Sequence, residues 1–169
     1  MYRKKFDGMD CSIARALDQV GEWWSLLIVR ECTLGTSRFD EFQRRLGIAR
    51  NVLTNRLNHL IEHGILEKLP VGDSERFFEY RLTPKGDELY PVLVALLQWG
   101  DKWAGDGKGG PIELLDHATG KPVEWMGPRT KNGPVLGYRG IRLKPGERAA
   151  DSTREVIDNR NRVILGQRR

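Results

Sequence analysis

Apolar residues recur at spacings of three and four through most of the first 103 residues, which predicts a succession of amphipathic helices. We expect the first two helices at residues 12–20 and 22–33, separated by Gly21. The second is apolar on nearly every side, so we expect it to be the central, buried helix. In the first helix, the residues expected to be buried are Ile13, Ala16, Leu17 and Val20.

The next two segments predict a helix-turn-helix, because a tight turn joins two short amphipathic helices. The first helix has Ser37 as a candidate N-cap and stops at Gly47, a residue typical of helix ends. The second covers residues 50–63 and is followed by Gly64. Its apolar side consists of Leu53, Leu57, Leu60 and Ile61.

The polar side of the 50–63 helix carries amides, a hydroxyl and arginines, where a solvated helix usually carries Glu and Lys. These groups hydrogen-bond to base edges and phosphates, so we predict that this side binds the major groove of double-stranded DNA. Phosphate contacts would fix the register, and we assign them to Arg38 and Arg56. The residues expected to face the bases are Arg50, Asn51, Thr54, Asn55 and Asn58.

After Gly64 the apolar spacing changes to the alternation of strands, which predicts a hairpin of residues 65–71 and 76–83. Phe78, Tyr80 and Leu82 share one face of its second strand. A hairpin directly after a recognition helix is a wing. Arg76, near its tip, is a candidate contact to the DNA backbone or minor groove.

A long helix is predicted from Thr83, a capping residue followed by Pro84, to Trp103, with Pro91 bending it or marking its true start. Nine of the 11 residues 89–99 are apolar, which is more than one packing face uses. A second copy of the chain would cover the surplus and form a twofold homodimer. The residues expected in this interface are Leu89, Leu93, Leu96, Leu97 and Trp99.

Composition shifts at residue 104, since residues 104–169 hold 11 of the 19 glycines. We therefore expect a winged-helix and dimerisation domain at 1–103, a linker at 104–110, a small β-rich extension at 111–150 and a polar tail at 151–169, either a short helix or disordered. The fold class is α+β: a winged helix-turn-helix domain with a dimerisation helix, plus a small glycine-rich, β-rich C-terminal extension.

Charge supports DNA binding only through its local arrangement. The net charge is +5, but residues 1–103 hold 15 Lys/Arg and 15 Asp/Glu, so the excess lies entirely in the extension. Within the helix-turn-helix, however, arginines outnumber acids and predict a local positive patch. The patch consists of Arg38, Arg44, Arg45, Arg50 and Arg56.

The sequence has no apolar run of the ~20 residues that span a membrane, and no apolar block follows its basic start as in a signal peptide. Two cysteines do not form a disulfide framework, so we expect a cytoplasmic protein with no membrane contact. No paired acids, activated nucleophile or phosphate loop are present, and we predict neither an enzyme nor a cofactor.

The three histidines, His59, His63 and His117, lack a cysteine or carboxylate set with metal-ligand spacing, so no metal site is expected. We expect His59 and His63 to be solvated. The tryptophans near the predicted dimer helix have two interpretations. They line a ligand cavity, or they pack in the core and the dimer interface, which is the favoured interpretation. They are Trp23, Trp24, Trp99 and Trp103.

These residues together resemble the HxlR-type winged helix-turn-helix regulators, relatives of the MarR group. The resemblance covers about residues 10–103 and rests on ALDQVGEWWSLLIVREC, RFDEFQRRLGIARNVLTNRLNHLIEHGIL and FEYRLTPKG. It departs from the family pattern at Glu22, where a lysine is usual. The resemblance implies a homodimeric bacterial transcription factor on a pseudo-palindromic operator, with repression as the favoured mode.

The resemblance also implies a small-molecule or electrophile effector, since many relatives respond to electrophiles or oxidants, some through a cysteine placed like Cys11. Cys11 precedes the first predicted helix, where the helix dipole lowers the pKa of a thiol, although Asp10 opposes this. Cys11 is therefore the candidate redox-sensing residue, and Cys32 is expected in the core.

Two other interpretations stay open. The winged helix would serve as a protein–protein interaction module with a ligand-binding C-terminal extension, and would then show no salt-sensitive binding to duplex DNA. Alternatively, residues 104–169 form a ligand-binding appendage that senses the inducer of a DNA-binding protein.

Overall fold

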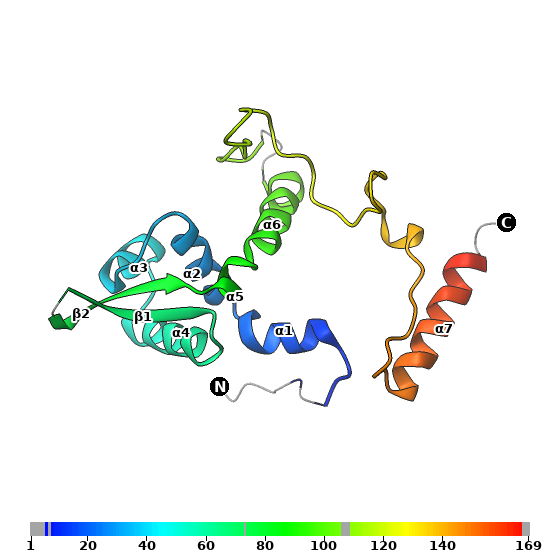
Figure 1. Ribbon diagram of the computed structural model, residues 1–169, viewed down its shortest axis with the longest axis horizontal. Helices are drawn as coiled ribbons and strands as arrows, with labels where there is room; N and C mark the ends of the chain where they lie inside the picture. The colour runs from blue at the N-terminus through cyan, green and yellow to red at the C-terminus, as the bar shows by residue number, and fades with distance from the viewer. Residues whose placement is uncertain (1–5, 7, 73, 106–108, 167–169) are drawn as a thin grey trace.

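The computed structural model describes residues 6, 8–72, 74–105 and 109–166. A helical body with a two-stranded hairpin lies on one side, α6 rises from it, and the chain then arches over to α7 (Figure 1). The elements are α1 (Ser12–Val20), α2 (Trp23–Thr33), α3 (Phe39–Leu46), α4 (Arg50–Glu62), β1 (Leu66–Val71), β2 (Ser74–Leu82), α5 (Pro84–Asp87), α6 (Tyr90–Trp103), the 3-10 turn η1 (Tyr138–Gly140) and α7 (Asp151–Gly166). The predicted α+β winged helix-turn-helix is confirmed.

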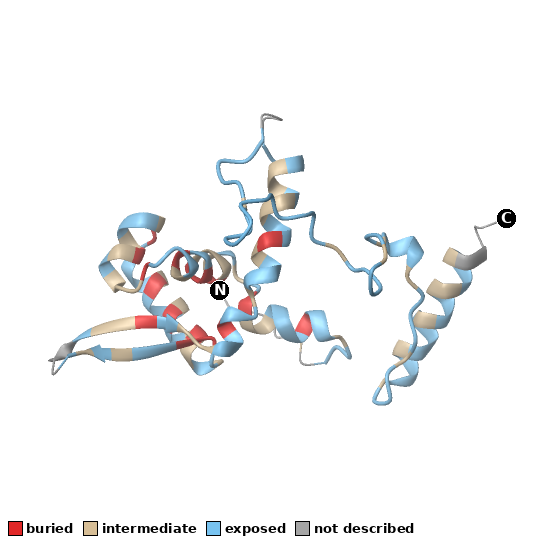
Figure 2. Ribbon diagram, turned by 45° about the horizontal axis from the view of Figure 1, so that its top comes forward, coloured by how far each residue is buried: buried red, intermediate tan, exposed pale blue. Residues whose placement is uncertain are grey.

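The core lies where α2, α3, α4 and the base of the hairpin meet, and Figure 2 shows the buried residues gathered there. The prediction that α2 is the central helix is confirmed, because Ile28 and Val29 are fully buried. The other large side chains of this core are Phe42, Ile48, Leu53, Leu57, Leu60, Ile65, Leu66 and Tyr80. This packing fixes α4 by its apolar side and leaves its polar side outward.

Glycine ends both helices of the helix-turn-helix, as predicted. Gly47 has a φ of 63° and donates its N–H to Gln43, and Gly64 has a φ of 64° after α4. The N-cap prediction for Ser37 was wrong, since Arg38 occupies that position and no side chain caps α3. The Ser37 carbonyl instead accepts the N–H of Tyr80 at 2.8 Å, which ties this segment to β2.

The predicted hairpin is confirmed. β1 and β2 are antiparallel, with Leu66 opposite Leu82 and an irregularity between Pro70 and Val71. Tyr80 is buried against the ring of Phe42, as the alternation along β2 predicted. The wing is thus anchored at its base to the α3 side of the core.

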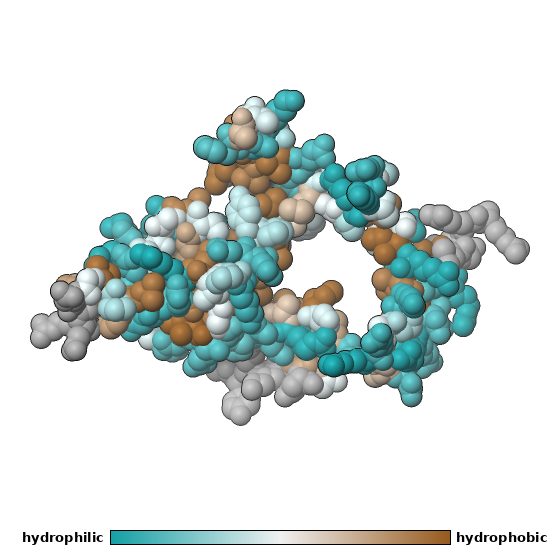
Figure 3. Space-filling model, viewed as in Figure 1, coloured by the Kyte–Doolittle hydropathy of each residue, from teal (hydrophilic) through white to brown (hydrophobic). Residues whose placement is uncertain are grey.

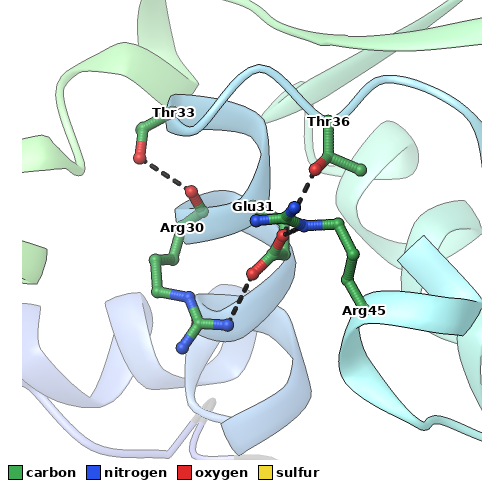
Figure 4. Close-up of polar contacts among 5 residues, drawn as sticks. All are labelled: Arg30, Glu31, Thr33, Thr36 and Arg45. Atoms are coloured by element: carbon green, nitrogen blue, oxygen red, sulfur yellow. Dashed lines mark hydrogen bonds and ion pairs between the residues drawn. The ribbon is translucent and has the colours of Figure 1, made fainter. Parts of the chain in front are cut away.

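Glu31 of α2 is a buried acid that links α2 to α3 (Figure 4). Its carboxylate accepts hydrogen bonds from Arg45 of α3, from Arg30 at 2.6 Å and from the Thr36 hydroxyl at 3.2 Å. Burial alone would raise the pKa of Glu31, but the two guanidinium groups outweigh burial and lower it. The acid therefore stays charged and holds α3 against α2.

The segment predicted as one helix from Thr83 to Trp103 divides into α5 and α6. The Thr83 hydroxyl caps α5 by accepting the N–H of Gly86, as the sequence indicated. Pro91 lies in the first turn of α6 and marks its start, because proline has no N–H for a helix interior. Leu89 and Leu93 pack on the core from this side.

The buried stripe predicted for α1 is confirmed at Val20 but was wrong for its other three residues in this single chain. Ile13 is 71% exposed, Leu17 is 43% exposed and Ala16 is also exposed, whereas Ala14 and Val20 are buried. α1 meets the body mainly through α2 and α4, and its buried residues are small or lie at its C-terminal end. Its larger apolar residues consequently face away from the core.

The β-rich prediction for residues 111–150 was also wrong. In the described part of the extension, pairing is limited to two isolated bridges, Leu115 with Pro122 and Arg129 with Val135. Glycines and prolines recur at short intervals from Gly120 to Gly146, which disfavours long strands there. The described tail is helical, as α7, and residues 106–108 of the predicted linker lie outside the described residues. No described residue from 104 to 164 is buried.

Polar contacts at three places hold the extension. Gln98 of α6 bonds the backbone of Glu124 and Met126, and Arg160 of α7 donates to the Ile141 carbonyl at 2.8 Å. At the far end, Asp10 accepts from the backbone N–H of Ala150 and the hydroxyl of Thr153, which lowers the pKa of Asp10. We call the described part of the extension, residues 109–166, the arm. A hollow lies between the arm, α6 and α1 (Figure 3). Among the described helices, none has the length and apolarity to span a membrane.

Candidate nucleic-acid interface

The polar side of α4 lies on the surface because its opposite side is locked into the core by Leu53, Leu57 and Leu60. The five residues predicted to face the bases all prove to be exposed. The first four of them line one open groove on the protein surface. In chain order the five are Arg50, Asn51, Thr54, Asn55 and Asn58.

Local contacts partly orient these side chains. The Thr54 hydroxyl donates to the Arg50 carbonyl at 2.9 Å, and the Asn51 side-chain oxygen accepts the N–H of Val52 at 2.9 Å. The Arg50 guanidinium stacks 4.9 Å from the centroid of Phe39. Asn55 has no side-chain hydrogen bond within the described part of the chain, so both ends of its amide are available to a base edge.

The positive patch is smaller than the sequence indicated. Arg45 is turned inward to Glu31, and Arg56 lies 3.8 Å from Glu22. Arg38, whose guanidinium lies 5.7 Å from the Phe77 ring, sits between α3 and the wing. Three arginines, Arg38, Arg44 and Arg50, have no ion-pair partner among the described residues and carry the remaining positive charge.

The wing contributes less defined candidates. Arg76 belongs to β2, but its side chain lies outside the described residues. Lys68 stacks on Phe78 at 3.9 Å, and Arg81 pairs with Glu79 at 2.9 Å. These two basic side chains are therefore engaged within the hairpin.

The two cysteines lie in different surroundings. Cys11 is half-buried at the N-cap position of α1, next to the Asp10 contact with α7. Burial, reinforced by the charge of Glu31, raises the pKa of Cys32 to about 12. Cys32 packs against the core, as expected, and its thiol is protonated at neutral pH.

The tryptophans do not line a common cavity within the described residues. Trp23 is 78% exposed, Trp99 is 57% exposed and Trp103 is 66% exposed, whereas Trp24 packs against the core. Within one chain, only Trp24 fits the interpretation as core packing.

One cluster of possible metal ligands was not predicted from the sequence. His59 and Glu62 of α4 and the following His63 each place one nitrogen or oxygen within 4.8 Å of the others, so the expectation that no histidine has a carboxylate at ligand spacing was wrong. The signal was the spacing i, i+3 and i+4, which aligns side chains on one helix face. His59 is also not simply solvated, since its ring bonds the Gln19 carbonyl at 3.0 Å. Burial and the neighbouring His63 lower the pKa of His59.

Comparison with known sequences gives consistent matches. The model of the HxlR-like helix-turn-helix family matches residues 19–108. The HTH-type transcriptional regulator Rv3095 of Mycobacterium tuberculosis is 38% identical over 142 residues, which are 84% of this chain and 89% of that protein. The HTH-type regulator sll1512 of Synechocystis is 34% identical over 57% of this chain and 72% of that protein.

Solved structures agree. The transcription factor PA1607 has a TM-score of 0.76 and 38% identity, over 85% of this chain and all of that chain. PA1374 from Pseudomonas aeruginosa has a TM-score of 0.59 and 36% identity, over 86% of this chain and 99% of that chain. Both matches are longer than residues 1–103 alone, so they include part of the extension.

Proposed function

The chain belongs to the HxlR-like helix-turn-helix family of transcriptional regulators, and on this premise we propose that it represses transcription as a homodimer bound to a pseudo-palindromic operator. Its site is a binding surface, and the relatives and the fold are those of regulators rather than enzymes. The proposed place of action is the cytoplasm, where bacterial DNA lies.

The exposed face of α4 carries this proposal. Asn51 and Asn55 lie one turn apart on a helix whose other side is buried, so their amides point outward together. An asparagine amide matches the donor and acceptor of an adenine edge, and an arginine matches guanine. Arg38 and Arg44, which come from α3 and its N-cap and have no ion-pair partner among the described residues, would hold phosphates and set the register.

A second copy of the chain is the proposed cover for the exposed apolar residues of α1 and α6. Ile13 and Leu17 of α1 and Leu96 and Trp99 of α6 are large, apolar and exposed in one chain. Figure 3 shows apolar surface on α6 beside the hollow that the arm partly encloses. Large apolar side chains that are exposed close together often mark an interaction site. In such a dimer the two α4 helices would read half-sites about one helical turn, or a multiple, apart.

The proposed signal is a small molecule or a thiol-reactive compound that alters DNA affinity. A relative of known structure, the regulator YodB of Bacillus subtilis, was solved in its reduced form and matches with a TM-score of 0.50 at 28% identity. In this chain such a compound would act at Cys11, because the raised pKa of Cys32 keeps that thiol unreactive.

Operator binding tests the function. Fragments bound by the protein are selected from genomic DNA, and affinity is then measured by fluorescence anisotropy at several salt concentrations. Asn51→Ala and Asn55→Ala are each expected to weaken operator binding by about 5- to 150-fold, or ~1–3 kcal/mol, with little change on unrelated DNA. Asn159→Ala, an exposed asparagine of α7, is the matched control. Wild-type operator affinity in both α4 variants, or no salt-sensitive duplex binding, would contradict the proposal.

A further inference from the structure

The end of α4 brings together three groups that bind metal ions. One ring nitrogen each of His59 and His63 and a carboxylate oxygen of Glu62 lie within 4.8 Å of one another, and the ring centroids are 4.2 Å apart. Bonds of about 2.0–2.1 Å to zinc place ligand atoms roughly 3–4 Å apart, so the three atoms need to close by only about an ångström. Glu62 is exposed and has the freedom to make that adjustment.

Both histidines are already held as metal-binding histidines usually are. The His59 ring bonds the Gln19 carbonyl through Nε2 at 3.0 Å, and the His63 ring bonds the His59 carbonyl through Nδ1 at 2.9 Å. A carbonyl only accepts, so these nitrogens carry the protons. In the neutral rings, Nδ1 of His59 and Nε2 of His63 therefore keep their lone pairs for an ion.

The charges around the cluster are compatible with a cation. Glu62 supplies a negative charge within the cluster itself. Lys85 approaches from α5, but its ammonium donates to the His63 carbonyl and to the Gln19 side chain, each at 2.7 Å. Arg56, one turn earlier on α4, lies beside Glu22. Both nearby cations are thus engaged with other oxygens.

We propose that His59, Glu62 and His63 form a binding site for a divalent transition-metal ion, with water completing its coordination. Two imidazoles and one carboxylate favour ions such as zinc, nickel and copper over magnesium or calcium, which prefer oxygen ligands. The ion lies where α4 meets α1 through Gln19 and α5 through Lys85. Its binding to the folded state raises the melting temperature. The site exists whether or not the proposed operator binding holds.

The test is a calorimetric titration of the full chain, free of any polyhistidine tag, with zinc, nickel and copper ions, and with cobalt as a spectroscopic probe. One ion is expected per chain, together with a rise in melting temperature and cobalt absorption bands. His63→Ala and Glu62→Gln are each expected to weaken metal affinity by about 10-fold or more. A loss of this size is typical even when a group that only orients a metal ligand is removed. His117→Ala, a histidine of the extension, is expected to change nothing.

Glu62→Gln keeps the length and helix propensity of the side chain, so it stays informative if His63→Ala fails to fold. Circular dichroism checks both variants. The proposal is overturned if zinc, nickel and copper all fail to bind at micromolar concentration, or if both variants bind them with unchanged affinity. Binding that disappears in Cys11→Ser or Cys32→Ser while Glu62→Gln has no effect would also overturn it, because the ion would then be held by thiols.

Discussion

A single buried carboxylate, Glu31, determines how α3 is held against α2. Its side chain is almost fully buried, whereas the side chains of Arg30 and Arg45 remain about half exposed. Replacing it with the neutral Glu31→Gln removes both ion pairs but leaves the arginines access to water. We expect a loss of about 3 kcal/mol in the free energy of unfolding at pH 7, at the low end for a broken buried pair. Urea unfolding measures this loss.

The same variant has a defined pH dependence. The folded protein lowers the pKa of Glu31, so the charged acid contributes stability above the unfolded pKa of about 4.3, and this contribution is lost as pH falls through the folded value. The difference between wild type and Glu31→Gln should shrink below roughly pH 4. Glu124→Gln, which removes the exposed partner of Arg129, is the control and should cost less than about 1 kcal/mol. A difference that stays constant from neutral to acidic pH would contradict the assignment.

Among the elements, α5 depends on a close backbone approach. A Cβ on Gly86 would overlap the carbonyl oxygen of Ile65 and lie 2.9 Å from the Leu82 side chain. Gly86→Ala is therefore expected to push α5 off the start of β1 and destabilise the fold by about 1–3 kcal/mol. Gly100→Ala, in α6 with open space at its Cβ, should instead stabilise by about 0.5–1 kcal/mol. Melting curves of both variants decide, and equal effects would show that the approach at Gly86 relaxes freely.

The elements that sequence predicted well are those with local causes. Periodicity placed α2 and α4, glycines at positions 47 and 64 ended helices, and alternation along β2 buried Tyr80. Ser37 misled because its carbonyl serves β2, a contact between segments more than 40 residues apart that no local pattern encodes. The β-rich prediction for residues 111–150 failed because their short alternating runs have no partner strands, and alternation alone does not form a sheet.

The candidate site shows the same division. The outward face of α4 was predictable because burial of Leu53 and Leu57 leaves the polar residues no other direction. The inward turn of Arg45 was not predictable, since it depends on where α2 places Glu31. The histidine cluster was encoded locally by its helical spacing, yet its ring orientations depend on the Gln19 carbonyl of another helix.

At the scale of the whole molecule, a single chain leaves large apolar residues of α1 and α6 exposed. α1 and α6 both present large apolar residues beside the hollow, and the arm that bounds it has no buried residue among those described. In the proposed homodimer, a second chain in the hollow would cover α1, α6 and the arm together, and it would then bury Ile13, which is exposed in the single chain.

Leu96 on α6 tests this arrangement, because it is 49% exposed and lies one turn after Leu93, which packs against the core. Leu96→Asp would place two charges in the proposed twofold interface, and we expect sedimentation velocity to show a shift from dimer to monomer. Operator affinity should fall at least about 100-fold with it, since a monomer binds only one half-site. Leu34→Asp, at the exposed end of α2, should leave both unchanged. A wild-type monomer, or a variant that stays dimeric with full operator affinity, would exclude α6 as the element that pairs the two reading helices.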